Sequence, residues 1–122
     1  MRKAIILLGH GSRDPLWRQP IEAVAARLVA AHPELAVRSA YLELEPPALH
    51  VAAAELIARG ATHVSVVPMF LGTGKHAREH VPALVEALRS RYSGVQFTLQ
   101  APVGEDARVL DLLASVALES GR

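Results

Sequence analysis

Hydrophobic residues along the chain fall into two alternating patterns, short continuous runs and longer segments with helical spacing. The continuous runs, bounded by glycine or by loop residues, are typical of strands buried in a parallel sheet. In the spaced segments apolar residues recur every three or four positions, which predicts amphipathic helices. The predicted strands are 3–8, 37–44, 63–70 and 95–100, and the predicted helices are 21–31, 46–57, 82–88 and 106–118.

The alternation of strands and helices predicts one α/β domain over residues 1–122, with a four-stranded parallel sheet and helices on both of its faces. A doubly wound sheet of the flavodoxin type has the strand order 2-1-3-4, which makes the first and third strands neighbours. In such sheets ligands bind beyond the carboxyl ends of the strands. We therefore look for functional residues in the loops that follow the strands.

Composition narrows the classes of function. Hydrophobic residues make up 51% of the chain, enough for one core, while 4% aromatic residues and a net charge of +1 do not favour nucleic-acid binding. The apolar runs are too short to span a bilayer or to form a signal peptide, so we expect a soluble cytoplasmic protein. The chain has no cysteine, so a bound metal would need histidine, carboxylate, carbonyl or substrate ligands.

The first strand is followed by the motif GHGSR, residues 9–13. Its two glycines allow a sharp turn and a close approach to a ligand. The turn presents His10 at the carboxyl edge of the sheet, where a neutral imidazole can bind a metal or accept a proton. A glycine-rich turn with an incidental histidine is the alternative, and the position at the sheet edge favours a functional role.

The third strand is followed by LGTGKHAREHVP, residues 71–82. Because this strand should neighbour the first, His76 can approach His10. His80 lies four residues further on and would share a face with His76 if the segment were helical. Pro82 argues against a firm helix here, so we expect His76 in a loop and leave the direction of His80 open. The segment also matches the H-x-x-E-H pattern of zinc peptidases, a weak match in so short a chain.

The second predicted strand ends in YLELEPP, residues 41–47. Side chains alternate along a strand, so Glu43 and Glu45 should point to opposite sides. A carboxylate beside two imidazoles would complete a three-ligand metal site. We assign that role to Glu43 and expect Glu45 to cap the following helix.

Basic residues gather in the loops after the first and third strands. Arg13, Arg18, Lys75 and Arg78 would form a local positive rim on a nearly neutral protein, which favours an anionic ligand. The remaining histidines lie at a helix end, within a helix and at the amino edge of the sheet, and we interpret them as surface or structural residues. They are His32, His50 and His63.

Taken in order, these motifs resemble the small sirohydrochlorin chelatases, class II enzymes that insert cobalt or ferrous iron into a tetrapyrrole. The resemblance covers nearly the whole chain and rests on four segments. They are ILLGHGSRDP, YLELEPP, VSVVPMFLGTGKHAREHVP and APVGED.

The resemblance implies roles for particular residues. His10 and His76 match the histidines that flank the metal in this family, and Glu43 matches an implicated glutamate, so we expect these three to act as catalytic residues and metal ligands. Many relatives carry Asp where this chain has His80, which bears on the choice of metal. We assign substrate binding to Ser12, Arg13, Lys75, Arg78 and His80.

The resemblance also implies the substrates and the assembly. We expect no permanently bound cofactor, a divalent metal (cobalt, iron or nickel) and a sirohydrochlorin-type tetrapyrrole as substrates, and a role in cobalamin or siroheme synthesis. The sequence contains no P-loop pattern, so we also expect no use of ATP. Larger relatives contain two such domains, so a homodimer is expected, with exposed Leu16, Trp17 and Phe70 at the interface or facing the tetrapyrrole. A non-catalytic carrier and a phosphoryl-transfer enzyme using His10 remain alternatives.

Overall fold

A computed structural model describes residues 2–120 and contains four parallel strands in the order β2-β1-β3-β4. The predicted fold class and strand order are therefore confirmed. The strands are β1 (Lys3–Gly9), β2 (Ala36–Tyr41), β3 (His63–Pro68) and β4 (Gln96–Leu99). The helices are η1 (Pro15–Arg18), α1 (Gln19–Ala31), α2 (Leu49–Ala58), α3 (Lys75–Arg91), η2 (Val103–Glu105) and α4 (Ala107–Glu119).

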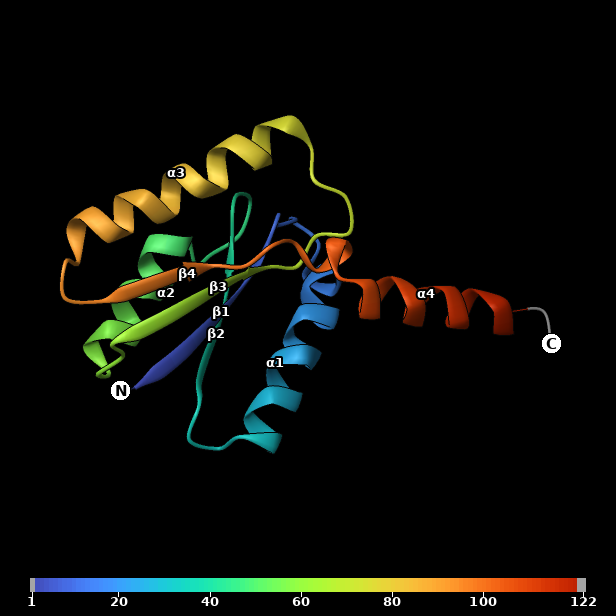
Figure 1. Cartoon of the computed structure of the whole chain (residues 1–122), viewed down its shortest axis with the longest axis horizontal. Helices are drawn as coiled ribbons and strands as arrows, with labels where there is room; N and C mark the ends of the chain where they lie inside the picture. The colour runs from blue at the N-terminus through green and yellow to red at the C-terminus, as the bar shows by residue number, and fades with distance from the viewer. Residues whose placement is uncertain (1, 121–122) are drawn as a thin grey trace.

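The central strand of the sheet is β1, and most of it is buried. It pairs with β2 on one side and with β3 on the other, so both of its edges are hydrogen-bonded. Every residue from Ile6 to Gly9 is buried. The carboxyl ends of β1 and β3 therefore lie side by side, as the predicted strand order requires (Figure 1).

The two faces of the sheet are covered unequally. Alternate residues of β1 and β3 pack with α2 and α3 in the main core, which includes Ile6, Leu8 and Val66. The opposite face packs against α1 through a smaller cluster around Leu7 and Ile21. The predicted helices thus lie on both faces of the sheet. The face that packs against α1 has the smaller hydrophobic cluster.

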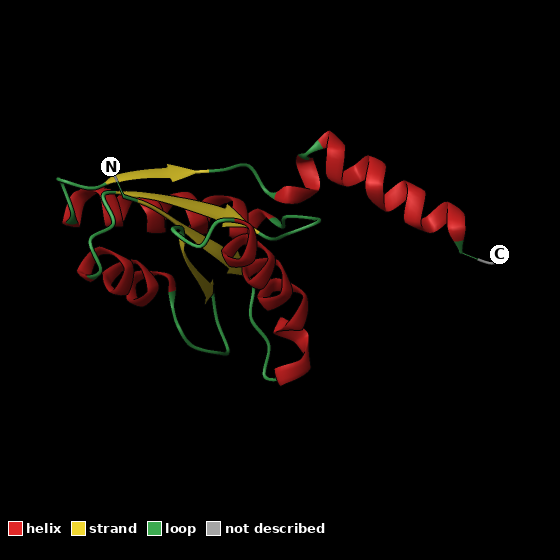
Figure 2. Cartoon of the chain, turned by 90° about the horizontal axis from the view of Figure 1, so that it is seen from below, coloured by secondary structure: helices red, strands yellow, loops and turns green. Residues whose placement is uncertain are grey.

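Helix α4 projects away from the sheet (Figures 1 and 2). None of its residues is buried, and its large apolar side chains are exposed along its length. Its first turn is capped by Asp106, whose carboxylate accepts the backbone N–H of Arg108. The segment from η2 to this cap directs the helix outward.

Several element boundaries differ from the prediction; α2, for example, begins at Leu49 instead of residue 46, and two of the differences bear on the site. β2 ends at Tyr41 instead of residue 44, and the positive φ of 69° at Leu44 excludes that residue from a strand. α3 begins at Lys75, so Pro82 lies inside the helix. The missing hydrogen bond at Pro82 is offset by burial of residues spaced on one helical face, Ala77, Val81, Val85 and Leu88.

None of the helices within residues 2–120 is both long enough and apolar enough to cross a membrane.

Candidate functional site

His10 occupies the turn that leaves the central strand. Gly11 has a φ of 102°, a conformation that L side chains rarely adopt, and a Cβ there would overlap the carbonyl oxygen of Glu43. A backbone hydrogen bond joins the two segments beside this contact: the N–H of Glu43 donates to the carbonyl oxygen of His10 at 3.0 Å. The GHGSR turn is thus packed against the β2–α2 loop, and glycine is required for that approach.

The imidazole of His10 stacks on Phe70. The ring centroids are 4.2 Å apart and the ring planes meet at 25°. Phe70 is only 3% exposed, so the expectation that it forms an exposed interface is wrong. Phe70 ends the apolar run 63–70 and packs in the main core, so the imidazole of His10 stacks against a buried ring.

The two glutamates after β2 do not follow the alternation of a strand. Glu43 is exposed and lies in the bend beyond Tyr41, so the argument that placed it by strand alternation is wrong. Glu45 does not cap α2 as predicted, since the residue before that helix is Ala48 and has no side-chain cap. The side chain of Glu45 instead turns toward the GHGSR loop.

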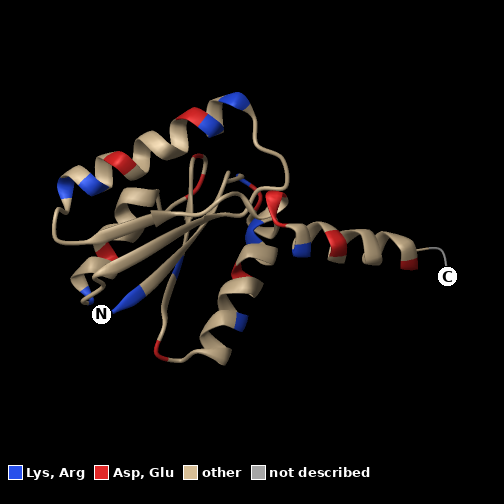
Figure 3. Cartoon of the chain, in the orientation of Figure 1, with Lys and Arg blue, Asp and Glu red and all other residues tan. Residues whose placement is uncertain are grey.

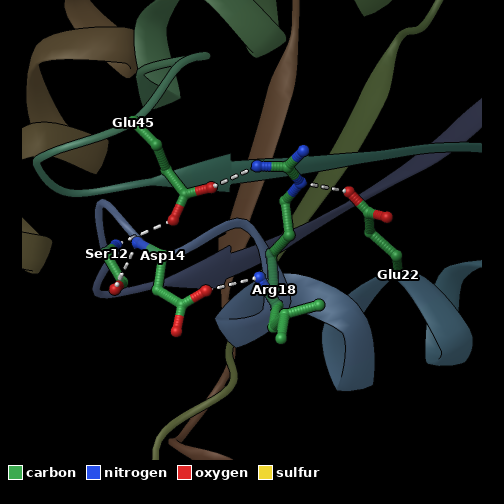
Figure 4. A network of polar contacts seen from close by, with 6 residues as sticks. Ser12, Asp14, Arg18, Glu22 and Glu45 are labelled. Atoms are coloured by element: carbon green, nitrogen blue, oxygen red, sulfur yellow. Dashed lines mark hydrogen bonds and ion pairs between the residues drawn. The ribbon is translucent and has the colours of Figure 1, made fainter.

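Glu45 joins three segments in one polar network (Figure 4). Its carboxylate accepts the backbone N–H of Ser12 at 2.7 Å and the Nη1 of Arg18 at 3.3 Å, and its side chain is only 6% exposed. Arg18 also pairs with Glu22 at 2.9 Å. Burial, followed by the negative charge of Glu45, raises the pKa of the neighbouring Tyr41, which keeps this phenol neutral.

His76 and His80 lie on the first two turns of α3. Their rings stack with centroids 5.2 Å apart and an interplanar angle of 16°. His76 is exposed and His80 is half-buried. The expectation that His76 lies in a loop is wrong, and the possibility that both histidines share a helix face is confirmed.

The predicted substrate-binding residues have different settings. Arg13 and Lys75 are exposed. The Nη1 of Arg78 donates to the carbonyl oxygen of Thr73 at 2.6 Å, and the Oγ of Ser12 accepts the N–H of Asp14 at 3.1 Å. Basic residues lie at both ends of α3 (Figure 3), and Arg78 also lines a cavity of about 210 Å³ beyond the ends of β3 and β4.

The structure brings the predicted site residues to one edge of the sheet without forming a closed ligand cluster. His10 follows β1, and His76 lies in the first turn after the loop that leaves the neighbouring strand β3. Within residues 2–120, no three His, Asp or Glu side chains are close enough together to hold a metal ion. The three-ligand arrangement of His10, His76 and Glu43 is thus not assembled in this conformation.

Two contributors to this site were missed by the sequence analysis. Phe70 supports His10, and burial at the end of the run HVSVVPMF was the signal that could have indicated this. Glu45 holds the GHGSR loop, and no local pattern distinguishes it from Glu43.

Solved structures with this fold place the chain in the class of chelatase-like α/β domains. A protein described as a cobalamin (vitamin B12) biosynthesis CbiX protein, from Marinobacter aquaeolei VT8, is 34% identical, with a TM-score of 0.82 and coverage of 96% of this chain and 95% of that chain. The sirohydrochlorin chelatase SirB from Bacillus subtilis subspecies spizizenii, in complex with cobalt, is 29% identical with the same TM-score. It covers all of this chain, which corresponds to 52% of SirB.

The chain belongs to the CbiX family, whose family model matches residues 4–120. The sirohydrochlorin ferrochelatase of Bacillus subtilis (strain 168) is 33% identical over 90% of this chain and 42% of that protein. The sirohydrochlorin cobaltochelatase of Methanococcoides burtonii is 27% identical over 94% of each. This chain therefore spans less than half of the first relative and nearly all of the second.

Proposed function

We propose that this protein inserts a divalent metal, cobalt by preference or ferrous iron, into a sirohydrochlorin-type tetrapyrrole without ATP, in the cytoplasm. The observation that carries the proposal is the placement of His10, held by the glycine turn at the carboxyl end of the central strand in a chain of the CbiX family. The family resemblance and the names of the relatives support the reaction class.

For metal insertion, the protein needs to supply metal ligands, bases that accept protons and groups that bind the tetrapyrrole. Metal insertion requires that two pyrrole N–H protons leave the macrocycle and that water leaves the ion. The imidazoles of His10 and His76 can hold the ion, and once the ion has passed to the macrocycle their freed nitrogens can accept these protons, while exposed Glu43 can balance charge. Such a role for all three needs the loops to close further around the substrates, since they form no ligand cluster here.

The rim of the site suits a carboxylate-bearing macrocycle. Arg13 and Lys75 are exposed, so their charges are free to form charge-assisted hydrogen bonds with substrate carboxylates. Arg18 is less available, because it pairs with Glu22 and Glu45. We therefore assign docking to Ser12, Arg13, Lys75, Arg78 and His80 rather than to Arg18.

The proposal includes a homodimer, supported by two apolar surfaces of the same chain. Polar residues of α4 form one stripe at 108, 111, 115 and 119, and the rest of the helix is mostly apolar and exposed. A hollow of about 500 Å³ lies on the sheet face beside α1, lined by apolar residues such as Leu28, Val67 and Met69. The first turn of α4 borders this hollow through Arg108 and Val109, and the rest of the helix projects away from the sheet (Figure 2), so the α4 of a second copy is the occupant we propose.

The dimer is tested by light scattering on Leu113→Glu, which places a charge on the apolar side of α4. Ser115→Glu, on the polar stripe, is the matched control. We expect the first variant to be monomeric and the second to remain dimeric. A monomeric wild-type protein, or a dimer unaffected by Leu113→Glu, would contradict this arrangement.

The reaction is tested by mixing the protein with sirohydrochlorin and Co²⁺, Fe²⁺ or Ni²⁺ and following the visible spectrum. We expect acceleration over the uncatalysed reaction, and a loss of about 100-fold or more in His10→Ala. His32→Ala, at the end of α1, should keep full activity. Tight binding without turnover would support a carrier instead, and no acceleration with any metal would refute the enzyme.

A further inference from the structure

The two histidines of α3 form a pair that the family resemblance does not assign as a unit. His76 and His80 are four positions apart in the sequence, which places both imidazoles on one face of the helix. The geometry of the rings agrees, since the ring centroids are 5.2 Å apart and the ring planes meet at 16°. To share one ion at metal–nitrogen distances of about 2.0–2.1 Å, the two rings must rotate out of this stacked arrangement, because the lone pair of an imidazole nitrogen lies in the plane of its ring.

Neither ring of this pair is committed to another role in the fold. Among residues 2–120, no hydrogen bond or ion pair involves the imidazole of either His76 or His80. By contrast, the Nε2 of His63 lies 2.9 Å from the Oγ1 of Thr98, and His32 lies 3.7 Å from a carboxylate oxygen of Glu34. The nitrogens of the α3 pair are thus available to a ligand.

The surroundings of the pair leave space for an ion and its water molecules. His76 is exposed, and His80 lines a cavity of about 410 Å³ between α3 and the segment that follows β2, together with Leu42 and His50. Lys75 and Arg78 add positive charge to the same turns, which weakens cation binding. This setting suits an ion that is bound and then released rather than held permanently.

We propose that His76 and His80 form a two-imidazole chelate that captures Co²⁺, Ni²⁺ or Zn²⁺ from solution at the start of α3. Water would complete the coordination, and affinity should rise from Co²⁺ to Ni²⁺, as is general for nitrogen ligands. Mg²⁺, which prefers oxygen ligands, should not bind there. The inference rests on the proposed function in one respect, that the captured ion is the metal substrate of the neighbouring His10.

The chelate is tested on the full chain with metal alone. We titrate Co²⁺ and Ni²⁺ into wild-type protein, His80→Gln and the matched control His50→Gln by calorimetry. His50 lines the same cavity but is outside the pair, so its replacement should leave affinity unchanged. His80→Gln should weaken binding about tenfold or more, because one of two imidazole ligands is lost. Equal affinity in His80→Gln and wild type would overturn the proposal.

A second measurement does not depend on any variant folding. Zn²⁺ added to wild-type protein should shift the imidazole nitrogen resonances of His76 and His80 together in NMR spectra. Zn²⁺ shifts at His76 and His10 without His80 would place the ion elsewhere and overturn the chelate.

The insertion assay separates this inference from the proposed function. If His80→Gln loses metal affinity while the wild type shows no insertion with any metal, the chelate stands and the enzymatic function fails. If the wild type inserts metal and His80→Gln binds Co²⁺ normally, the function stands and the chelate fails.

Discussion

The two loops that carry the site histidines are built in opposite ways. The loop after β1 is held by a positive-φ glycine packed against Glu43, by the Glu45 carboxylate and by the stacking of His10 on Phe70. The loop after β3 is open, since a Cβ at Gly72 or Gly74 would meet no atom within 4 Å. One histidine of the site is thus fixed by its surroundings, and the other stands at an exposed helix start.

This difference suggests a division of labour within the proposed site. His10 is preorganised, which favours a group that must meet the reacting centre in one geometry. His76 is exposed at the start of α3, which favours capture of a ligand from solution. The following experiments test this contrast, from the largest expected effect to the smallest.

Gly11→Ala should have the largest effect. A Cβ at φ 102° is strained and overlaps the carbonyl oxygen of Glu43, so we expect a loss of about 2–4 kcal/mol in the free energy of unfolding and strongly reduced insertion. Gly72→Ala in the open loop should change stability by less than about 0.5 kcal/mol. Urea denaturation measures both, and equal effects would remove the contrast between the loops.

Glu45→Gln should have the next largest effect. The buried carboxylate accepts hydrogen bonds from Ser12 and Arg18, and replacing it should cost about 1–3 kcal/mol. Glu55→Gln is the matched control, because Glu55 pairs with Arg38 at 2.8 Å in a solvent-exposed setting and should contribute less than about 0.5 kcal/mol. If both variants unfold at the same urea concentration, the Glu45 network does not hold the first loop.

Phe70→Leu should reduce activity more than stability. The change shortens a buried side chain, at a cost of about 1 kcal/mol, and removes the aromatic surface under His10. We expect the insertion rate to fall about tenfold because His10 is less well oriented. Leu71→Ala, at the neighbouring exposed position, should leave the rate unchanged. An unaltered rate in Phe70→Leu would show that the stacking does not position His10.

Asp106→Asn should have the smallest effect, visible as a dependence on pH. Hydrogen bonds from the Arg108 side chain, followed by its backbone N–H, lower the pKa of Asp106 to about 2. A lowered pKa means that the ionised carboxylate stabilises the fold above the ordinary pKa of 3.8, and that this contribution is lost as the pH falls toward 2.

Thermal melts of wild type and Asp106→Asn between pH 7 and pH 2 measure this contribution. The difference in Tm should be constant above about pH 5 and should shrink below pH 4. It should also shrink in high salt, because the pair is exposed. A difference that persists unchanged to pH 2 would contradict the cause assigned to the pKa shift.

The sequence was sufficient for the architecture, and it led to a prediction of where the site lies. Four apolar runs separated by helical spacing predicted the parallel sheet, and the rule that ligands bind at carboxyl ends selected the loops of His10 and His76. The prediction of the sheet is confirmed, because hydrophobic periodicity and strand order reflect the burial of whole elements. The clustering of His10, His76 and Glu43 in one metal site stays a prediction.

The start of α3 and the direction of the Glu45 side chain depend on tertiary contacts, so hydrophobic periodicity alone could not predict them. Pro82 indicated a loop, but the burial of Val81 and Val85 on the sheet outweighs the lost hydrogen bond and extends α3 to Lys75. Glu43 and Glu45 look equivalent in the sequence, and only the folded loop shows that Glu45 accepts the N–H of Ser12.

What the sequence by itself determined was the order of strands and helices and the edge of the sheet where imidazoles would lie. Only the tertiary structure decided which contacts hold those imidazoles and where α4 points. In η2, the N–H of Gly104 donates to the carbonyl oxygen of Phe70 at 2.9 Å, and this contact between distant residues directs the final helix outward. Local patterns encode which surfaces are apolar, whereas the partner of each surface is chosen by the packing of the whole chain.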